Sequence, residues 1–247
     1  MRHCLIASIL FVAALSTMAD VSAQVQPQAP AKVKVVVLEL NGLGLHGRDA
    51  ELPKALGTYL RNSVATIDGL QLLPPVDVQL AVQASKNPKL IDCAGGAKCA
   101  TDIGKLVGAD RVIFGGISAF GEAYSLNARV IETATGKEVA RHQATFAGSR
   151  DALIPEIRLA AYKLLAPERI LGSLMVQADV DGVSVEIDGE PRGMTPLSEP
   201  IKNLAPGKHT VVLKRSGYSQ FQQELTIRPF ETAKLQLKLD RPAKAEQ

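Results

Sequence analysis

The sequence predicts an α+β protein with two parts, a mixed-sheet α/β domain followed by a small all-β sandwich. Two observations support this fold class. Between residues 33 and 167, apolar residues recur in turn at strand and at helical spacing, in the order β-α-β-α-α-β-β-β-α. After Pro167 the period falls to two, and short alternating strands are separated by turns rich in Pro, Gly and Ser. The first pattern indicates a mixed sheet with helices packed against it, and the second indicates a sandwich.

The N-terminal residues predict export. Arg2 precedes a short apolar run at residues 5–15, and small residues at 21–23 fit a cleavage site, as in a secretory signal peptide. The run is shorter than the ~20 residues that span a bilayer, which disfavours an uncleaved membrane anchor. We therefore expect a signal peptide at 1–23, a polar, Pro-rich linker at 24–32, and a protein exported to the periplasm or cell envelope.

The α/β domain is expected at residues 33–167. Its first strand, at 33–40, is almost continuously apolar and β-branched, as in a strand covered on both faces. Further strands are expected at 69–73, 111–117, 124–131 and 138–146, and helices at 52–67, 76–84, 101–107 and 150–165. Asp49 is the candidate N-cap of the first helix. Ile154, Ile157, Ala161 and Leu164 share one face of the last helix.

The sandwich is expected at residues 172–240, before a polar tail at 241–247. Val183, Val185 and Ile187 alternate with polar residues, and so do Leu235, Leu237 and Leu239. This period places one face of each strand in a dry core and the other in water. Asp188-Gly189 and Pro206-Gly207 supply turn residues, so we expect each to close a hairpin.

A glycine-rich segment, Gly42–Gly47, matches G-x-G-x-x-G and follows the first strand. A dinucleotide site also needs a helix that begins at the loop and an acidic residue at the end of the second strand. Here Pro53 delays the helix, and the second strand ends at residues 72–75 without a carboxylate. We therefore expect a mobile strand-to-helix loop and no cofactor. An exported nucleotide- or cofactor-binding enzyme that uses Gly42–Gly47 remains the alternative.

Two cysteines, Cys93 and Cys99, follow the signal peptide and enclose a Gly-Gly segment. An even number of cysteines in an oxidising compartment is typical of a disulfide. A C-x-x-C redox motif needs closer spacing, and a zinc site needs two further ligands that the neighbouring sequence does not supply. We therefore predict a structural disulfide between Cys93 and Cys99.

Catalytic motifs are sparse in this sequence. The three histidines after the signal peptide are scattered, at His46, His142 and His209, and no H-E-x-x-H occurs. Ser173 lacks the G-x-S-x-G context of a hydrolase, and Asp179 and Asp181 beside Gly182 fit a turn better than a calcium loop. We therefore expect no catalytic residues, no metal ligands and no enzymatic activity.

Charge and composition argue against nucleic-acid binding. The formal net charge is +3, and the predicted signal peptide does not alter it because it contains one Arg and one Asp. Aromatic residues make up only 4% of the chain, there is no Trp, and no run of Lys or Arg occurs. A basic groove and stacking platforms, on which nucleic-acid binding depends, are therefore not indicated.

The C-terminal part carries three spaced motifs. These are VSVEIDGEPRGMTPL at residues 183–197, LAPGKHTV at 204–211 and SGY at 216–218. Together, over residues 172–239, they resemble the PEGA domain, with its V-x-V-D-G…G-x-T-P-L, L-x-P-G-x-H-x-V and G-Y pattern. The resemblance implies a β-sandwich module of bacterial envelope and surface proteins that serves binding or architecture.

The first domain resembles another family more loosely. The opening strand, CATDIGKLVGADRVIFGG at residues 99–116 and LNARVIETATG at 126–136 are similar to the N-terminal domain of TolB and related envelope α/β domains. This resemblance extends over residues 33–166. It implies a partner-binding scaffold of the cell envelope and supplies no catalytic residues.

From these observations we expect a non-enzymatic binding or scaffold protein that contacts another envelope protein or a glycan. Loops on a rigid sandwich often carry function. We therefore select the turns at 190–194 and 216–219 as contact sites, with Glu190, Arg192, Met194 and Tyr218 as the candidate residues. The partner, the oligomeric state and the orientation of the two domains are not determined by the sequence.

Overall fold

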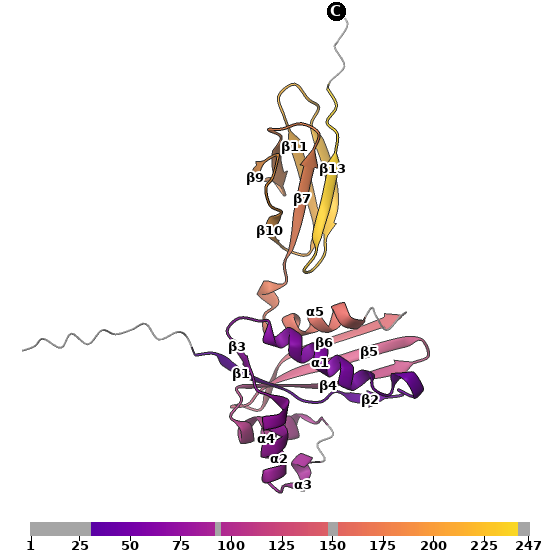
Figure 1. The fold of residues 1–247 in the computed structure, drawn as a ribbon, viewed down its shortest axis with the longest axis vertical. Coiled ribbons are helices and arrows are strands. Elements are labelled where there is room, and N and C mark those ends of the chain that lie inside the picture. Colours follow the sequence, from indigo (N-terminus) through magenta and orange to yellow (C-terminus); the bar gives the residue numbers. More distant parts are fainter. Residues whose placement is uncertain (1–30, 92–94, 148–152, 242–247) are drawn as a thin grey trace, which may run out of the picture. The chain divides into compact units, whose positions relative to one another are not determined.

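The computed structural model describes residues 31–91, 95–147 and 153–241, and Figure 1 shows the chain as a ribbon. The predicted signal peptide at 1–23, most of the linker at 24–32 and most of the tail at 241–247 lie outside the described residues. These segments therefore remain predictions.

The first part of the chain forms a mixed sheet, as predicted, but with six strands where the sequence indicated five. Its strands are β1 (Val33–Val37), β2 (Asn41–Leu43), β3 (Leu70–Leu72), β4 (Arg111–Phe120), β5 (Ala123–Glu132) and β6 (Lys137–Ala147). The order is β3-β1-β4-β5-β6, and β2 also pairs with β4. β1 runs parallel to both β3 and β4, whereas β4, β5 and β6 form an antiparallel meander. Together with the all-β part that follows, this confirms the α+β class.

Helices lie on both faces of this sheet (Figure 1). They are α1 (Leu52–Ala65), α2 (Pro75–Ala84), α3 (Pro88–Ile91), α4 (Ala97–Val107) and α5 (Leu153–Leu165), and a 3-10 turn, η1 (Gly47–Asp49), precedes α1. α1 and α5 pack on one face in a cluster that includes Val35 and Val37, whereas α2 and α4 pack on the other face in a cluster that includes Val36. Covering on both faces therefore explains the continuous apolar run of β1.

Two predictions about helix residues are wrong. The N-cap of α1 is Glu51 and not Asp49, whose Oδ2 instead accepts a hydrogen bond of 2.8 Å from the Tyr124 hydroxyl. On α5, Ile154 is 39% exposed, and Leu153 and Ala160 take its expected place in the core. A partner distant in sequence, Tyr124, engages Asp49, and packing against the sheet decides which face of α5 is covered, so local spacing specifies neither.

The second half of the chain forms two small sheets. One contains β10 (Ile201–Leu204), β7 (Gly172–Ala178) and β13 (Thr232–Leu237), in that order, and the other contains β12 (Phe221–Ile227), β11 (Gly207–Lys214), β8 (Ser184–Ile187) and β9 (Glu190–Met194). A single cluster of buried side chains includes Val183, Val185 and Ile187. The predicted small all-β sandwich is therefore confirmed, including its alternation of buried and wet residues.

The two predicted hairpin turns of the sandwich have different outcomes. Asp188 and Gly189 both have positive φ, 53° and 83°, and they join β8 to β9 as a hairpin, as expected. Pro206-Gly207 does not close a hairpin. β10 pairs with β7, and β11 pairs with β8, so this connection leads from one sheet to the other.

Candidate functional site

The glycine-rich segment Gly42–Gly47 is not the single mobile loop that the sequence suggested. Its first residues, Gly42 and Leu43, belong to β2 and pair in parallel with Ile117 and Ser118 of β4. Gly44 has a φ of 69°, and a Cβ at this position would lie 2.7 Å from the carbonyl oxygen of Ala119. The glycine therefore permits a close approach of two backbones and a left-handed conformation.

This geometry does not reproduce a dinucleotide site. α1 begins at Leu52, after the intervening turn η1, so the N-terminal N–H groups of the helix do not directly follow the glycines. A phosphate site of this type depends on those N–H groups. Close packing against β4 accounts for Gly44 alone, whereas a Cβ at Gly42 would meet the Pro53 side chain and Gly47 has a left-handed φ of 57°.

Of the two cysteines in the predicted disulfide, the structure describes only Cys99. Cys99 lies in α4 and packs against the cluster that contains Val36 and Phe114. Cys93 lies outside the described residues. The Cys93–Cys99 pairing therefore stays a prediction.

Three of the four candidate contact residues lie on an exposed strand and not in a turn. Glu190, Arg192 and Met194 belong to β9, the edge strand of its sheet, and all five residues of β9 are exposed. The β8–β9 register shifts between Val185, which faces Gly193, and Glu186, which faces Pro191. Arg192 is therefore the extra residue of a β-bulge, a feature that often re-aims side chains at functional edges.

Tyr218 lies apart from that edge. It precedes β12, which is the opposite edge strand of the same sheet, so the structure does not bring Tyr218 together with the β9 residues. Its half-buried ring has the guanidinium groups of Arg215 and Arg241 at 5.6 and 5.4 Å from its centroid, and its hydroxyl accepts a 3.3 Å hydrogen bond from Arg241. These contacts fix the ring in place.

A histidine that sequence reasoning left unassigned supports the β8–β9 hairpin. The Nδ1 of His209 lies 2.6 Å from Asp188 Oδ2, and its Nε2 lies 2.7 Å from the carbonyl oxygen of Ala205. Asp188 Oδ1 also accepts a 2.9 Å hydrogen bond from the backbone N–H of Thr210. Both ring nitrogens face acceptors, so the doubly protonated imidazolium is the form that satisfies both.

The titration of this pair follows from its contacts. Burial alone would lower the pKa of His209, but the hydrogen bonds to Ala205 and Asp188 and the charge of Asp188 outweigh it and raise the pKa above its ordinary value. The hydrogen bond from His209, together with that from Thr210, lowers the pKa of Asp188. Arg192 adds a nearby positive charge that acts on both groups. The turn next to β9 is thus held by a charged pair.

A second surface lies on the six-stranded sheet and was not predicted. On the face that carries α2 and α4, the described helices cover Val112 and Phe114 of β4 and Ile131 of β5. Beyond them the same face bears polar side chains in cross-strand rows. One row contains Gly116, Asn127 and Gln143, and the next contains Leu43, Ser118, Ser125 and Thr145. All of these residues except Thr145 line a cavity of about 400 Å³.

Apolar side chains flank one end of this face, which none of the described helices covers and which we call the helix-free face. Leu43 is 69% exposed, and Phe120, which follows Ser118 by two residues and so faces the same side of β4, is 68% exposed. Because the sequence spacing of β4 to β6 shows only alternating strands, neither the location of the helices nor the open face could be inferred from it. The signal that could have pointed to this surface is the run of polar residues at alternate positions 125, 127 and 129 of a central strand.

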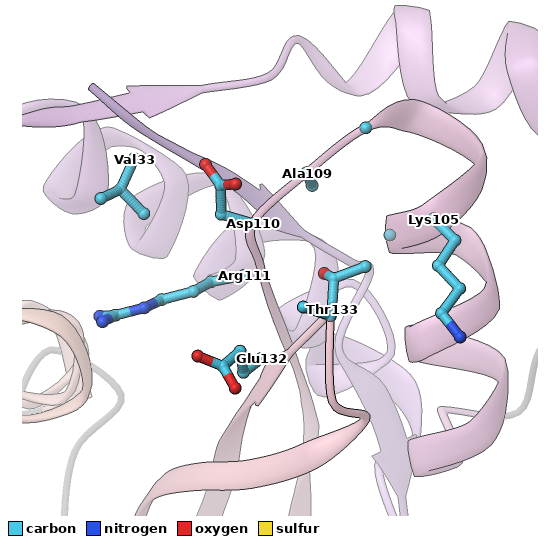
Figure 2. A pocket seen from close by; sticks show the side chains of 10 residues that line it. Val33, Lys105, Ala109, Asp110, Arg111, Glu132 and Thr133 are labelled. Atoms are coloured by element: carbon cyan, nitrogen blue, oxygen red, sulfur yellow. The ribbon is translucent and has the colours of Figure 1, made fainter. Parts of the chain in front are cut away.

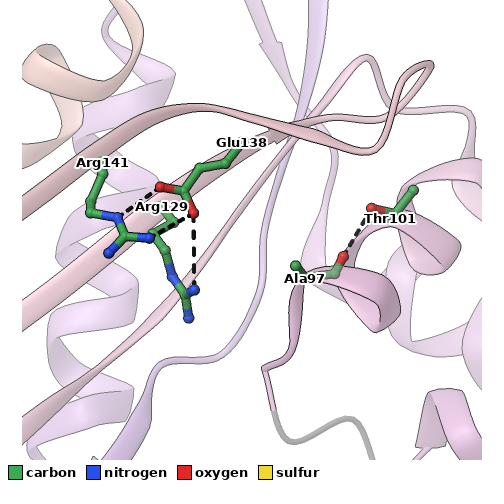
Figure 3. A network of polar contacts seen from close by, with 5 residues as sticks. All are labelled: Ala97, Thr101, Arg129, Glu138 and Arg141. Atoms are coloured by element: carbon green, nitrogen blue, oxygen red, sulfur yellow. Dashed lines mark hydrogen bonds and ion pairs between the residues drawn. The ribbon is translucent and has the colours of Figure 1, made fainter.

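Arg129 is the single charged residue among the described residues that line this cavity. Figure 3 shows Arg129 and Arg141 converging on Glu138. Arg141 holds this carboxylate with two hydrogen bonds of 2.7 and 3.1 Å, whereas Arg129 Nη1 lies 3.9 Å from it. The hydrogen bonds from Arg141, and then the charges of Arg141 and Arg129, lower the pKa of Glu138. The single carboxylate of Glu138 thus forms ion pairs with two guanidinium groups.

The Arg129 side chain is held in place but incompletely paired. Its guanidinium carbon lies 4.6 Å from the centroid of the Phe114 ring, and its side chain is 31% exposed. Within the described part of the chain, Nε of Arg129 and Oδ1 of Asn127 are buried without a hydrogen-bond partner. Buried polar atoms are normally paired, so these two atoms mark a place where the polar contacts are incomplete.

Another recess lies at the start of β4 (Figure 2). Asp110, Arg111 and Glu132 line one side, and Lys105 of α4 lies on the other side. The Asp110 carboxylate accepts a 2.7 Å hydrogen bond from the backbone N–H of Lys34. With two acidic and two basic side chains, this recess has no net charge with which to select a ligand.

The remaining histidine of the sheet, His142, has a structural contact. His142 of β6 is buried, and its Nε2 lies 2.8 Å from Glu156 Oε1 of α5, which ties the helix to the sheet. Within residues 31–91, 95–147 and 153–241, no three His, Cys, Asp or Glu side chains come close enough to hold a metal ion. In those same residues, no helix is long and apolar enough to span a membrane.

Comparison with solved structures finds matches to LpoB domains and to a TolB protein. The LpoB C-terminal domain from Salmonella enterica is 20% identical, with a TM-score of 0.41, over 49% of this chain and 87% of that chain. The LpoB C-terminal domain from Escherichia coli is 21% identical, with a TM-score of 0.39, over 50% of this chain and 88% of that chain. TolB from Acinetobacter baumannii is 9% identical, with a TM-score of 0.38, over 81% of this chain and 50% of that chain.

A TolB structure is therefore among the matches, but similarity at TM-scores this low does not indicate a shared function. The comparison with curated proteins finds no match. The comparison with family models matches the PEGA domain at residues 171–242, which contain the two-sheet sandwich with its exposed strand β9. The sequence resemblance is thus confirmed, and residues 171–242 of this chain form a PEGA domain.

Proposed function

We propose that this protein is an exported, non-enzymatic binding or scaffold protein of the bacterial envelope, which contacts another envelope protein or a glycan. The observation that supports this function best is the exposed edge strand β9 in the PEGA domain. An edge strand presents backbone groups and alternate side chains to a partner, and natural proteins usually blunt such edges.

The chemistry of β9 fits a protein partner. Pro191 has no backbone N–H, which restricts how much of the edge another strand can pair with. Recognition then depends on the side chains, of which Arg192 supplies a positive charge at the bulge and Met194, 64% exposed, supplies adaptable apolar surface. A partner with an acidic group beside an apolar surface would complement both.

The compartment is part of the same proposal. The signal-peptide pattern at residues 1–23 and the PEGA domain both favour the periplasm or cell envelope, with membrane contact only through a partner. The predicted Cys93–Cys99 disulfide would be stable in such an oxidising compartment. No observation on the described residues favours the alternative, a cofactor enzyme that uses Gly42–Gly47.

A cross-linking pull-down from intact envelopes tests the function with the full chain as bait. Arg192→Glu combined with Met194→Asp should reduce capture of the partner at least about tenfold, because both changes oppose the proposed contacts. Lys234→Glu, which also reverses one charge but lies on β13 of the other sheet, is the matched control and should leave capture unchanged. Equal capture by all three proteins would rule out β9 as the contact surface.

A further inference from the structure

The helix-free face of the six-stranded sheet offers side chains and not backbone to a ligand. β4 lies between β1 or β2 and β5, and β5 lies between β4 and β6, so the backbone groups of these central strands are engaged in sheet pairing. A peptide could not add to the sheet here as a further strand. A ligand must instead be recognised by the hydroxyl and amide groups of Ser118, Ser125, Asn127 and Gln143.

Those side chains have the chemistry that a polyhydroxylated ligand requires. Each hydroxyl can donate and accept, and each carboxamide presents both kinds of group, so they match the alternating donors and acceptors of sugar hydroxyls. The exposed Leu43 and Phe120 add apolar surface beside them, on which the apolar face of a sugar ring can lie. The cavity volume of about 400 Å³ is within the range of small-ligand sites.

Charge selects among such ligands. Arg129 is the single charged residue among the described residues that line the cavity, and its nearest carboxylate, Glu138, is already held more closely by Arg141. The cluster of two guanidinium groups and one carboxylate carries one positive charge in excess. That excess is complementary to one negative charge on a ligand, and a carboxylate carries a single charge and matches the geometry of a guanidinium.

We propose that this cavity binds a sugar unit that carries a carboxylate. The carboxylate contacts the guanidinium of Arg129, the hydroxyls contact the serine and amide side chains, and the ring lies against Leu43 and Phe120. This inference rests on the proposed envelope-binding function and specifies one ligand class for it, at a surface distinct from β9.

The test compares two sugars that differ in one group. N-acetylmuramic acid and N-acetylglucosamine share the ring and the acetamido group, but only the first carries a carboxylate. Titration of each into the folded protein, followed by NMR shifts of backbone amides, should show at least about tenfold tighter binding of the acid. The largest shifts are expected in β4 and β5, near residues 118 and 125–129.

Variants separate the contribution of charge to sugar binding from that of the apolar contact. Arg129→Gln should remove the preference for the acid. Glu138→Gln should do the opposite and tighten binding of the acid about two- to fivefold, because it frees Arg129 and Arg141 from their shared carboxylate, while binding of the neutral sugar stays unchanged. Phe120→Ala should weaken both sugars equally. Lys234→Glu, an exposed charge reversal on β13, is the control and should change neither affinity.

Three outcomes would overturn the proposal. One is equal affinity for the two sugars, and another is unchanged affinity for the acid in both Arg129→Gln and Glu138→Gln. The third is tighter binding at these amides of a short peptide with a free C-terminal carboxylate, which would assign the cavity to peptides. If Arg129→Gln does not fold, the gain in Glu138→Gln decides the question. Partner capture that depends on β9 can still succeed when the sugar titrations fail, so the two proposals are tested separately.

Discussion

The α/β part and the PEGA domain bury their side chains in different ways. In the first, one sheet has a core on each face, with Val35 and Val37 in one cluster and Val36 in the other. In the second, two sheets enclose a single cluster that includes Val185 and Leu213. The two architectures leave different parts of their sheets uncovered.

The consequence for binding follows from what is left exposed. The six-stranded sheet leaves part of a face open, where side chains of central strands are available but backbone groups are paired. The sandwich leaves an edge open at β9, where backbone groups and side chains are both available. A face therefore favours recognition by side-chain chemistry, whereas an edge favours contact with a protein partner.

Core truncations should give the largest effects and test whether the two parts have separate cores. Leu60 in α1 and Leu213 in β11 are both fully buried, in different clusters. Leu60→Ala and Leu213→Ala should each cost about 2–5 kcal/mol, because each leaves a cavity. Amide hydrogen exchange should show lost protection in the mutated part only. Equal losses in both parts would mean that the two cores unfold as one.

Glycine substitutions should have the next largest effect. A Cβ at Gly104 in α4 would lie 2.6 Å from Val112 Cγ2 and from Thr133 Oγ1, and a Cβ at Gly172 in β7 would lie 2.6 Å from the carbonyl oxygen of Arg228. Gly104→Ala and Gly172→Ala should each destabilise by about 1–3 kcal/mol. The measurement is thermal unfolding.

The matched control for this prediction is Gly57→Ala, also in a helix. A Cβ at Gly57 has its nearest neighbour at 3.6 Å, so there is room for the methyl group. Removing a helical glycine without a clash should stabilise by about 0.5–1 kcal/mol. If Gly57→Ala and Gly104→Ala shift the melting temperature in the same direction, close helix–sheet packing at Gly104 does not matter.

The His209–Asp188 pair should make the sandwich sensitive to pH. The pKa of His209 is raised above 6.5 in the folded state, so its contribution is full below pH 6.5 and is lost as pH rises through the folded pKa. The pKa of Asp188 is lowered below 3.8, so its contribution is full above pH 3.8 and is lost as pH falls through the folded pKa. The pair therefore stabilises the sandwich most between these two values.

Urea unfolding across pH 3 to 9 measures this dependence. His209→Gln should cost about 1 kcal/mol near pH 5, less at pH 8, and should flatten the profile of the sandwich. The α/β part supplies an internal reference in the same sample, because this pair does not contact it. A His209→Gln profile parallel to that of the parent protein would show that the pair does not titrate as proposed.

The smallest effect is expected at an exposed ion pair. Lys208 Nζ lies 2.7 Å from Glu224 Oε1, but the two side chains are 73% and 58% exposed. Glu224→Gln should change the free energy of unfolding by less than about 0.5 kcal/mol, because water screens the attraction. A larger loss by urea unfolding would indicate that this part of the sheet is held by charge and not by its core.

The regular elements could largely be predicted from spacing. Strands β4, β5 and β6 extend the predicted segments by only a few residues, and the buried positions Val183, Val185 and Ile187 follow the alternation in the sequence. The PEGA motifs identified the sandwich for the same reason, since their turn residues are local. Such features depend on residues close in the chain.

The candidate surfaces could be predicted only in part. Glu190, Arg192 and Met194 were selected correctly as exposed, but their arrangement as a bulged edge strand depends on β8. The open face depends on β2, a three-residue strand that pairs with β4 more than 70 residues later. The Arg129–Glu138–Arg141 cluster likewise joins two strands across a turn.

The glycines of Gly42–Gly47 also separate what the local sequence determines from what tertiary contacts determine. The sequence by itself determined the period of each strand and helix, the turn at Asp188-Gly189 and the motifs of the PEGA domain, because these depend on local sterics and on the 2.0- and 3.6-residue periods. Only the tertiary structure decided that Gly42 joins a strand, that His209 bridges to Asp188 and that Arg129 shares one carboxylate with Arg141. These contacts join residues brought together by folding, and no local pattern specifies such partners.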